Sequence, residues 1–184
     1  LSPMVYRTSD YGMSWVQRIS GIDNQTVVRV VREDKKVKGL LYAGTEAGLY
    51  ISFNDGVFWE KIQLNLPIVP INDLTIQDND LIAATAGRSF WILDDLGAIQ
   101  GLKEENGKDL ILFQPKKSYR IFGGSTSEPE PGLGQNPKSG VHIDYYLSEK
   151  RDSVLLCLKI IDSEGDVIRS LSNRQKDKFE IWPG

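Results

Sequence analysis

Hydrophobic and polar residues alternate with a period of two along much of the chain, which predicts short β-strands rather than helices. Each alternating run ends in a cluster of Gly, Asn, Asp or Ser, and these residues favour tight turns. The strands expected in the first part of the chain span residues 4–8, 14–20, 26–33, 40–45, 49–52, 59–64, 72–77, 81–85, 89–93 and 98–102. Residues 66–70 should form a crossover, because two prolines disfavour both helix and sheet pairing.

One turn pattern occurs twice, at residues 8–15 and 52–59. It contains Ser or Thr, then Asp or Asn two positions on, then Gly, and finally a Trp that opens the next strand. The copies are 44 residues apart, so that Thr8, Asp10, Gly12 and Trp15 correspond to Ser52, Asn54, Gly56 and Trp59. A degenerate third copy at 89–97 has no Trp in the outgoing strand. Short strands that repeat at a period in the low forties are typical of β-propeller blades.

The residue types in this pattern suit a structural role. The side chain of Asp10 or Asn54 can accept hydrogen bonds from backbone N–H groups of its own turn. Glycine two positions later supplies the positive φ that the reversal requires. The tryptophan at the end can bury a large apolar area between neighbouring sheets. We therefore expect these residues to stabilise turns rather than to act in catalysis.

Ser/Thr-x-Asp/Asn-x-Gly-x-x-Trp resembles the Asp-box of the bacterial-neuraminidase-repeat (BNR) propellers. This family includes sialidases, xyloglucan-cleaving glucanases, sortilin-type receptor ectodomains and large bacterial proteins labelled glycosyl hydrolase, and its Asp-box is structural. The segments GRSFWILDDL, LFQPKKSYRIF, NPKSGVHIDYYL and LKIIDSEGDVIRSL look like the passage from the last propeller blade to a sandwich domain in those large bacterial proteins. The chain departs from the family at Ala86, where relatives often have histidine before Gly-Arg.

The expected fold class is all-β, with a partial β-propeller of about two and a half four-stranded blades at residues 1–122. Residues 123–140, rich in Gly, Pro and Ser, are expected to form a linker. Residues 141–184 alternate again and have a hairpin turn at 162–166, which predicts a small Ig- or fibronectin-like β-sandwich module, complete or not. Further strands are expected at 110–114, 119–122, 141–147, 153–161, 167–171 and 178–182.

A closed propeller needs about four to eight blades, more than this chain supplies. We therefore expect it to be the C-terminal part of a larger propeller, and to pair with the remainder or with another copy of itself. The chain starts at Leu1 without a signal-peptide pattern, so we interpret it as a mature or excised piece. The resemblance implies a secreted, periplasmic or cell-surface location in a bacterium.

Charge and composition exclude several classes of partner. The net charge is −3, with 22 Lys and Arg against 25 Asp and Glu, which argues against nucleic acid or an anionic membrane surface. No apolar run is long enough to span a bilayer. The single cysteine, Cys157, is expected to be a small core residue, and the single histidine, His142, an ordinary surface or edge residue on a strand of the second module.

Candidate ligand chemistry lies at the turns opposite the Asp-box turns. In a propeller those turns surround the central funnel, which would place Glu46 and Arg88 near a ligand. Glu46 could act as an acid or base, and Arg88 could bind an anionic or hydroxyl-rich ligand. The alternative is that both are solvated turn residues or part of a local ion pair.

No catalytic residue, metal site or cofactor is assigned from the sequence. Asp94 and Asp95 are adjacent on a strand end and point to opposite faces, so they cannot be the facing carboxyl pair of a glycosidase. The acidic turn at 162–166 lacks the longer loop and terminal Glu of a calcium site. No Gly-rich phosphate loop precedes a helix, because no helix is expected.

Two functions remain open. The first is a non-catalytic portion of a carbohydrate-active propeller protein, which would supply wall residues and bind glycan. The second is a sortilin-like, protein-binding propeller with no hydrolase activity. Facing carboxylates elsewhere in the parent protein would make that parent a glycoside hydrolase, whereas this chain alone is not expected to turn over substrate.

Overall fold

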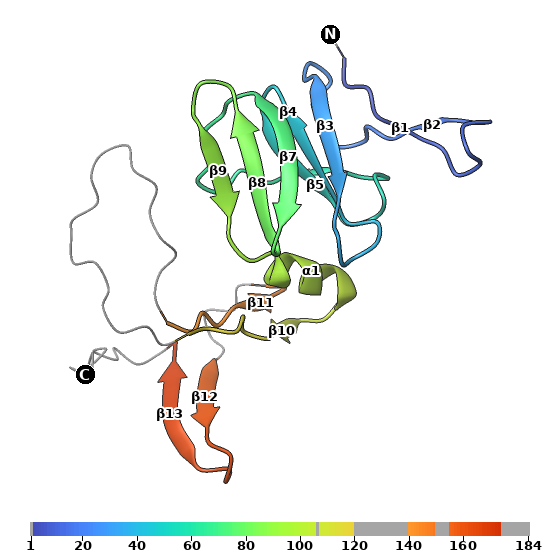
Figure 1. Cartoon of the computed structure of the whole chain (residues 1–184). Helices are drawn as coiled ribbons and strands as arrows, with labels where there is room; N and C mark the ends of the chain where they lie inside the picture. The colour runs from blue at the N-terminus through green and yellow to red at the C-terminus, as the bar shows by residue number, and fades with distance from the viewer. Residues whose placement is uncertain (1, 106, 120–139, 150–154, 174–184) are drawn as a thin grey trace. The chain divides into compact units, whose positions relative to one another are not determined.

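The computed structural model describes residues 2–105, 107–119, 140–149 and 155–173 (Figure 1). By their internal contacts these residues belong to two compact units, Leu1–Leu147 and Ser148–Gly184. Strands dominate both units, so the all-β class is confirmed, with one eight-residue helix as the exception. In the first unit the elements are β1 (Tyr6–Arg7), β2 (Val16–Gln17), β3 (Val28–Glu33), β4 (Leu41–Thr45), β5 (Gly48–Ser52), β6 (Glu60–Lys61), β7 (Ile71–Gln77), β8 (Asp80–Thr85), β9 (Phe90–Leu93), α1 (Gly97–Glu104), β10 (Leu110–Leu112) and β11 (Tyr145–Leu147).

Consecutive strands pair with one another in antiparallel sheets. Strands β3 to β6 form a four-stranded sheet in chain order, and β7 to β9 form a three-stranded sheet. Strands β1 and β2 form a separate two-stranded sheet. The sheets do not close into a ring in the part of the chain that the structure describes, and the number of propeller blades stays a prediction.

The β3–β6 and β7–β9 sheets share one hydrophobic core. Alternation places every second residue of a strand on the shared face, apart from a bulge in β7 between Ile71 and Asp73. From the four-stranded sheet this face receives Tyr42, Leu49 and Ile51, and from the three-stranded sheet it receives Ile71, Leu74, Ile76, Leu81 and Ala83. The two sheets therefore stack face to face through their buried side chains.

The opposite face of the β3–β6 sheet is also covered. Ala43 and Tyr50 lie on this face and form a second core cluster with Ile22 and Trp59. Val5, next to β1, packs against this cluster. The four-stranded sheet thus lies between β7–β9 on one side and the segment that contains β1 and β2 on the other.

The helix α1 corrects the expectation of a strand at 98–102 and of a chain without helices. The backbone N–H of Gly97 donates to Asp95 Oδ1 at 3.0 Å, and this bond lies in the turn that starts the helix. Ile99 then packs against the large core cluster while Gln100 is buried, a one-sided burial that suits a helix. Glycine at 101 leaves room for the ring of Phe113, which a Cβ atom would contact at 2.7 Å.

The later strands pair differently from the sequence expectation. Strand β11, which alternation assigns to the second module, pairs with β10 at Leu110–Leu112 and belongs to the first unit. The second unit contains a hairpin of β12 (Cys157–Ile161) and β13 (Val167–Ser172). The expected strands at 119–122 and 178–182 and the linker at 123–140 lie wholly or almost wholly outside the described residues, and the sandwich stays a prediction.

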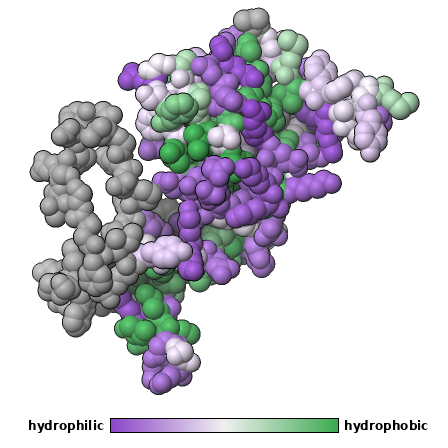
Figure 2. All heavy atoms as spheres, viewed as in Figure 1, coloured by the Kyte–Doolittle hydropathy of each residue, from purple (hydrophilic) through white to green (hydrophobic). Residues whose placement is uncertain are grey.

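Apolar side chains are exposed on both units. Figure 2 shows them at the β8–β9 side of the β7–β9 sheet and over the β12–β13 hairpin, whereas hydrophilic residues cover α1. Cys157 lies in this hairpin and is exposed, so the expectation of a core cysteine is wrong. In the part of the chain that the structure describes, no helix has the length and apolar composition of a membrane span.

Candidate functional site

The two repeated turns have the same internal hydrogen bonds. In the first turn (residues 8–15), Thr8 Oγ1 accepts from the N–H of Gly12 at 2.8 Å and donates to Asp10 Oδ1 at 2.8 Å. In the second turn (residues 52–59), Ser52 Oγ accepts from the N–H of Gly56 at 2.9 Å and donates to Asn54 Oδ1 at 3.0 Å.

The same correspondence extends through the rest of each turn. Asp10 Oδ1 accepts from the N–H of Ser14 at 2.9 Å, and Asn54 Oδ1 accepts from the N–H of Phe58 at 2.8 Å. Two successive residues with positive φ occupy the centre of each turn, a glycine following a non-glycine residue. The polar side chains that define the sequence pattern thus make their hydrogen bonds within their own turns, and this indicates a structural role for them.

Hydrogen bonds make Asp10 a stronger acid than usual. The hydroxyl and the N–H of Ser14 and the hydroxyl of Thr8 lower the pKa of Asp10 from 3.8 to about 2. Asp10 is partly exposed and this pKa lies far below neutral pH, so the shift stabilises the turn locally and does not poise the group for acid–base chemistry near neutral pH.

Glu46 lies in the turn between β4 and β5, at the end of the sheets opposite the second repeated turn. Arg29 Nη2 donates to Glu46 Oε1 at 3.0 Å, and Arg29 Nη1 donates to Asn72 Oδ1 at 3.3 Å. These side chains are half-exposed and link the start of β3 to the start of β7. Glu46 therefore belongs to a surface polar cluster that spans two sheets.

Arg88 lies in the turn between β8 and β9, at the same end as Glu46. The backbone of this turn is anchored to the crossover, because the N–H of Ala86 donates to the carbonyl of Pro70 at 2.8 Å. The carbonyl of Arg88 accepts from Trp91 Nε1 at 3.0 Å. No hydrogen bond or ion pair among the described residues joins Arg88 to Glu46, so the structure places both at one end of the sheets without bringing them into contact.

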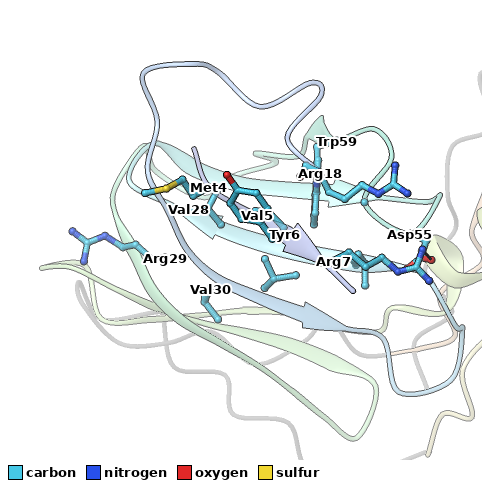
Figure 3. Close-up of a pocket in the computed structure, with 13 residues that line it drawn as sticks. Met4, Val5, Tyr6, Arg7, Arg18, Val28, Arg29, Val30, Asp55 and Trp59 are labelled. Atoms are coloured by element: carbon cyan, nitrogen blue, oxygen red, sulfur yellow. Dashed lines mark hydrogen bonds and ion pairs between the residues drawn. The ribbon is translucent and has the colours of Figure 1, made fainter. Parts of the chain in front are cut away.

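A cavity of about 420 Å³ lies between the β1–β2 sheet and the β3–β6 sheet (Figure 3). Its floor is apolar and comes from strands β3 and β4 of the larger sheet, with Val28, Val31 and Leu41. Met4, Val5 and Tyr6 line the side formed by β1 and the residues before it. This cavity carries no signal in the sequence, because its walls are separate in the chain and meet only in the fold.

Three arginines border this cavity. Arg7 Nη1 forms an ion pair with Asp55 Oδ2 at 2.5 Å, and Arg29 is the residue that binds Glu46. Arg18 contributes a buried Nε atom that has no hydrogen-bond partner among the described residues. A buried donor without an acceptor is unfavourable.

A buried polar network lies at the other end of the sheets. Asp34, only 6% exposed, accepts from Gln100 Nε2 at 3.1 and 3.0 Å and from the hydroxyl of Tyr42 at 3.1 Å. Gln100 Nε2 also donates to Asn79 Oδ1 at 2.8 Å. One amide group from α1 thus joins the β3–β4 turn to the β7–β8 turn.

The network shifts the acidity of both of its ionisable members. Burial by itself raises the pKa of Asp34, but hydrogen bonds from Gln100, from two backbone N–H groups and from Tyr42 together bring it below its usual value. Burial and the negative charge of Asp34 raise the pKa of Tyr42. Asp34 therefore stays ionised and Tyr42 neutral, which fits a fixed structural network better than a proton-transfer site.

Other candidate residues remain apart. Among the described residues, no three His, Cys, Asp or Glu side chains are grouped as a metal site would require. His142 precedes β11 and lies outside any strand. Asp95 Oδ1 accepts from Asn79 Nδ2 at 3.0 Å, which joins it to the turn that follows β7.

The chain matches no protein-family model, and no curated protein or solved structure has significant similarity to it. Its function is therefore inferred from the geometry of its own residues.

Proposed function

We propose that this chain forms consecutive blades of an Asp-box β-propeller, in a structural and non-catalytic role, and binds carbohydrate at the turns that contain Glu46 and Arg88. The observation that carries this proposal is a repeated pairing register. Tyr50 of β5 lies opposite Ala43 of β4, and Trp91 of β9 lies opposite Ala83 of β8. An aromatic residue faces alanine at the same position of two successive sheets.

The stacking of the sheets supports the same proposal. Blades of a propeller pack face to face around an axis, and each buries both faces against its neighbours. The β3–β6 sheet is buried on both faces, with every residue of β5 buried. Its first strand β3 lies near β7, the first strand of the next sheet, where Arg32 Nε donates to the carbonyl of Leu74 at 2.8 Å.

The polar cluster at the Glu46 end has the chemistry that carbohydrate binding needs. Hydroxyl groups of a sugar can donate to the carboxylate of Glu46 and accept from the guanidinium groups of Arg29 and Arg88. Glu46 is paired with an arginine instead of facing a second carboxyl, and a glycosidase requires two facing carboxyls about 5 to 10 Å apart. This arrangement favours binding without hydrolysis.

A glycan array with the 184-residue chain tests the proposal. We expect retention of a subset of glycans, loss of that retention in Glu46→Gln and Arg88→Gln, and no released sugar after incubation. Lys35→Gln is the matched control, because it removes a charge from the turn at the opposite end of the β3–β6 sheet. An array without a bound glycan, or equal retention by all variants, would refute the carbohydrate-binding role.

A protein-binding propeller without hydrolase activity is the second candidate. Phe90 and Ile92 favour it, because they are 73% and 57% exposed on β9 and offer an apolar surface to another protein. This candidate uses a sheet face and not the turns. Ile92→Asp should therefore leave glycan retention unchanged, which separates the two surfaces in the same assay.

A further inference from the structure

A second hollow, of about 700 Å³, lies on the β3–β6 sheet beside the loop that connects β2 to β3. Its walls are the loop residues 21–25 and the side chains of Tyr50 and Lys61. Tyr50 of β5 lies opposite Lys61 of β6, so both side chains lie on the same face of the sheet. All of these segments are internal to the chain, and the volume falls in the range of about 300–1,000 Å³ that is typical of ligand-binding clefts.

Tyr50 contributes a hydroxyl group that is open to a ligand. Tyr50 is only 4% exposed, and its hydroxyl has no hydrogen-bond partner among the described residues. Arg18 Nε and Gln63 Oε1 are the side-chain atoms of these residues that are both fully buried and unpaired, so the hydroxyl of Tyr50 retains contact with solvent. The hydroxyl of a buried tyrosine usually has a partner. A ligand in the hollow can supply that partner without moving the ring.

The other polar groups of the hollow include both signs of charge. Lys61 can donate through its ammonium group and Asp23 can accept through its carboxylate, and both side chains are exposed. Among the described residues neither of them forms an ion pair. Asp23 Oδ1 also accepts from the N–H of Gln25 at 2.9 Å, which holds the carboxylate at the loop. A simple anion would meet this carboxylate and a simple cation would meet the ammonium group, whereas the hydroxyl groups of a sugar both donate and accept.

This hollow lies close to the turn that contains Glu46. The N–H of Glu46 donates to the carbonyl of Val27 at 3.0 Å, and Gln25, which lines the hollow, precedes Val27 by two residues. On the other side, Tyr50 follows the first residue of β5, Gly48, by two residues, which is about 7 Å of strand. Neighbouring sugar units of one glycan can therefore reach both places.

We propose that this hollow is a second sugar subsite, so that the ligand is an oligosaccharide with one unit at the Glu46 turn and another in the hollow. This inference rests on the carbohydrate-binding role proposed above and specifies the class of glycan. The sugar unit in the hollow accepts from Tyr50 and Lys61 and donates to Asp23. A monosaccharide fills only one of the two places and therefore binds more weakly than an oligosaccharide.

Titration of the isotope-labelled 184-residue chain with defined sugars tests this proposal by nuclear magnetic resonance. The probes are cellotriose, maltotriose and chitotriose, each compared with its monosaccharide, glucose or N-acetylglucosamine. We expect at least one trisaccharide to shift the backbone amides of Asn24, Lys61 and Glu46 together. Its affinity should exceed that of its monosaccharide about tenfold or more, because the second subsite adds several hydrogen bonds.

Tyr50→Phe tests the hydroxyl alone, because it keeps the buried ring. We expect it to weaken binding of that trisaccharide about threefold to tenfold, the effect of one hydrogen bond. Tyr6→Phe is the matched control, since Tyr6 occupies the equivalent position in the first copy of the repeat and does not line the hollow. Lys61→Gln should also weaken binding, whereas Lys35→Gln, at the opposite end of the sheet, should not. Circular dichroism shows whether each variant is folded.

Shifts at Glu46 without shifts at Asn24 and Lys61, or an unchanged affinity in Tyr50→Phe, would refute the second subsite and leave the carbohydrate role intact. Shifts confined to the hollow would overturn both the two-place oligosaccharide and the role of the Glu46 turn. Sodium sulfate that shifts the same amides in place of the sugars would show an anion site instead. No shift with any of the trisaccharides would overturn the subsite, whereas the glycan array decides separately on the carbohydrate role.

Discussion

The two repeated turns have the same local structure in very different surroundings. Their side-chain hydrogen bonds match pair by pair, yet Trp15 is 59% exposed and Trp59 only 1%. Trp15 Nε1 donates to Gly12 within its own turn at 3.1 Å. Trp59 Nε1 instead donates to the carbonyl of Arg18 at 3.0 Å, in the preceding repeat. Short-range sequence determines the turn, whereas the neighbouring repeat determines what the tryptophan contributes.

This difference shows how one repeat stabilises the next. The N–H of Trp59 donates to the carbonyl of Ser20 at 2.8 Å, so both the ring and the backbone of Trp59 attach to the segment after β2. The exposed ring of Trp15 has no such segment among the described residues. The unit of stability is therefore the contact between the two segments that carry the repeated turns, and not the isolated turn.

The largest expected difference in stability is between the alanine variants of the two tryptophans. Trp59→Ala should lower the free energy of unfolding by about 3–5 kcal/mol, because it removes a fully buried aromatic ring and leaves a cavity. Trp15→Ala should lower it by less than about 1 kcal/mol, because the ring is mostly in solvent. Urea denaturation followed by circular dichroism measures both values. Equal losses would contradict the role assigned to the contact between repeats.

Two glycines give the next test. Gly12 and Gly21 have φ of +93° and +91°, so alanine is strained at either position. A Cβ at position 21 would also overlap the carbonyl oxygen of Trp59, whereas at position 12 it would lie 3.7 Å from the ring of Trp15. Gly12→Ala should cost about 1 kcal/mol and Gly21→Ala at least about 2 kcal/mol, measured as differences in denaturation midpoint.

The hydroxyl groups at the start of each turn should have smaller effects. Ser52 is 1% exposed, and Ser52→Ala leaves the N–H of Gly56 without its acceptor, which should cost about 1–2 kcal/mol. Thr8→Ala exposes the N–H of Gly12 to water, which can replace the lost bond, and should cost about half as much or less. Thermal unfolding of the two variants tests this order, and a larger loss for Thr8→Ala would reverse it.

The smallest effect is a pH dependence confined to the first turn. The pKa of Asp10 in the folded chain is about 2, below the ordinary value of 3.8, so its hydrogen bonds stabilise the turn above pH 3.8. That stabilisation is lost as the pH falls from 3.8 to about 2. Exchange of the Ser14 N–H should accelerate over this interval. Asp10→Asn should make the first turn as insensitive to acid as the second, which has Asn54 at this position.

Local rules in the sequence predicted most of the strands and the geometry of both turns, because the hydrogen bonds there join residues at most four positions apart. They failed at α1, where the three residues between Gly97 and Gly101 fit a short strand as well as a helix. The buried position of Gln100 favours the helix, and it depends on a hydrogen bond to Asp34, which lies 66 residues earlier in the chain. The cavity beside β1 was equally beyond prediction, since Met4 and Val28 meet there only after two sheets have packed.

Gln100 also determines where the chain can be cut. A recombinant fragment that stopped after β9 would contain every strand of the two stacked sheets, but it would lose the amide that satisfies Asp34 and Asn79. The carboxylate of Asp34 would keep its bonds from Tyr42 and from two backbone N–H groups, but the β3–β4 and β7–β8 turns would no longer share a partner. Fragments for crystallography or protein engineering should accordingly extend past Glu105, so that the helix still links the ends of both sheets through Gln100.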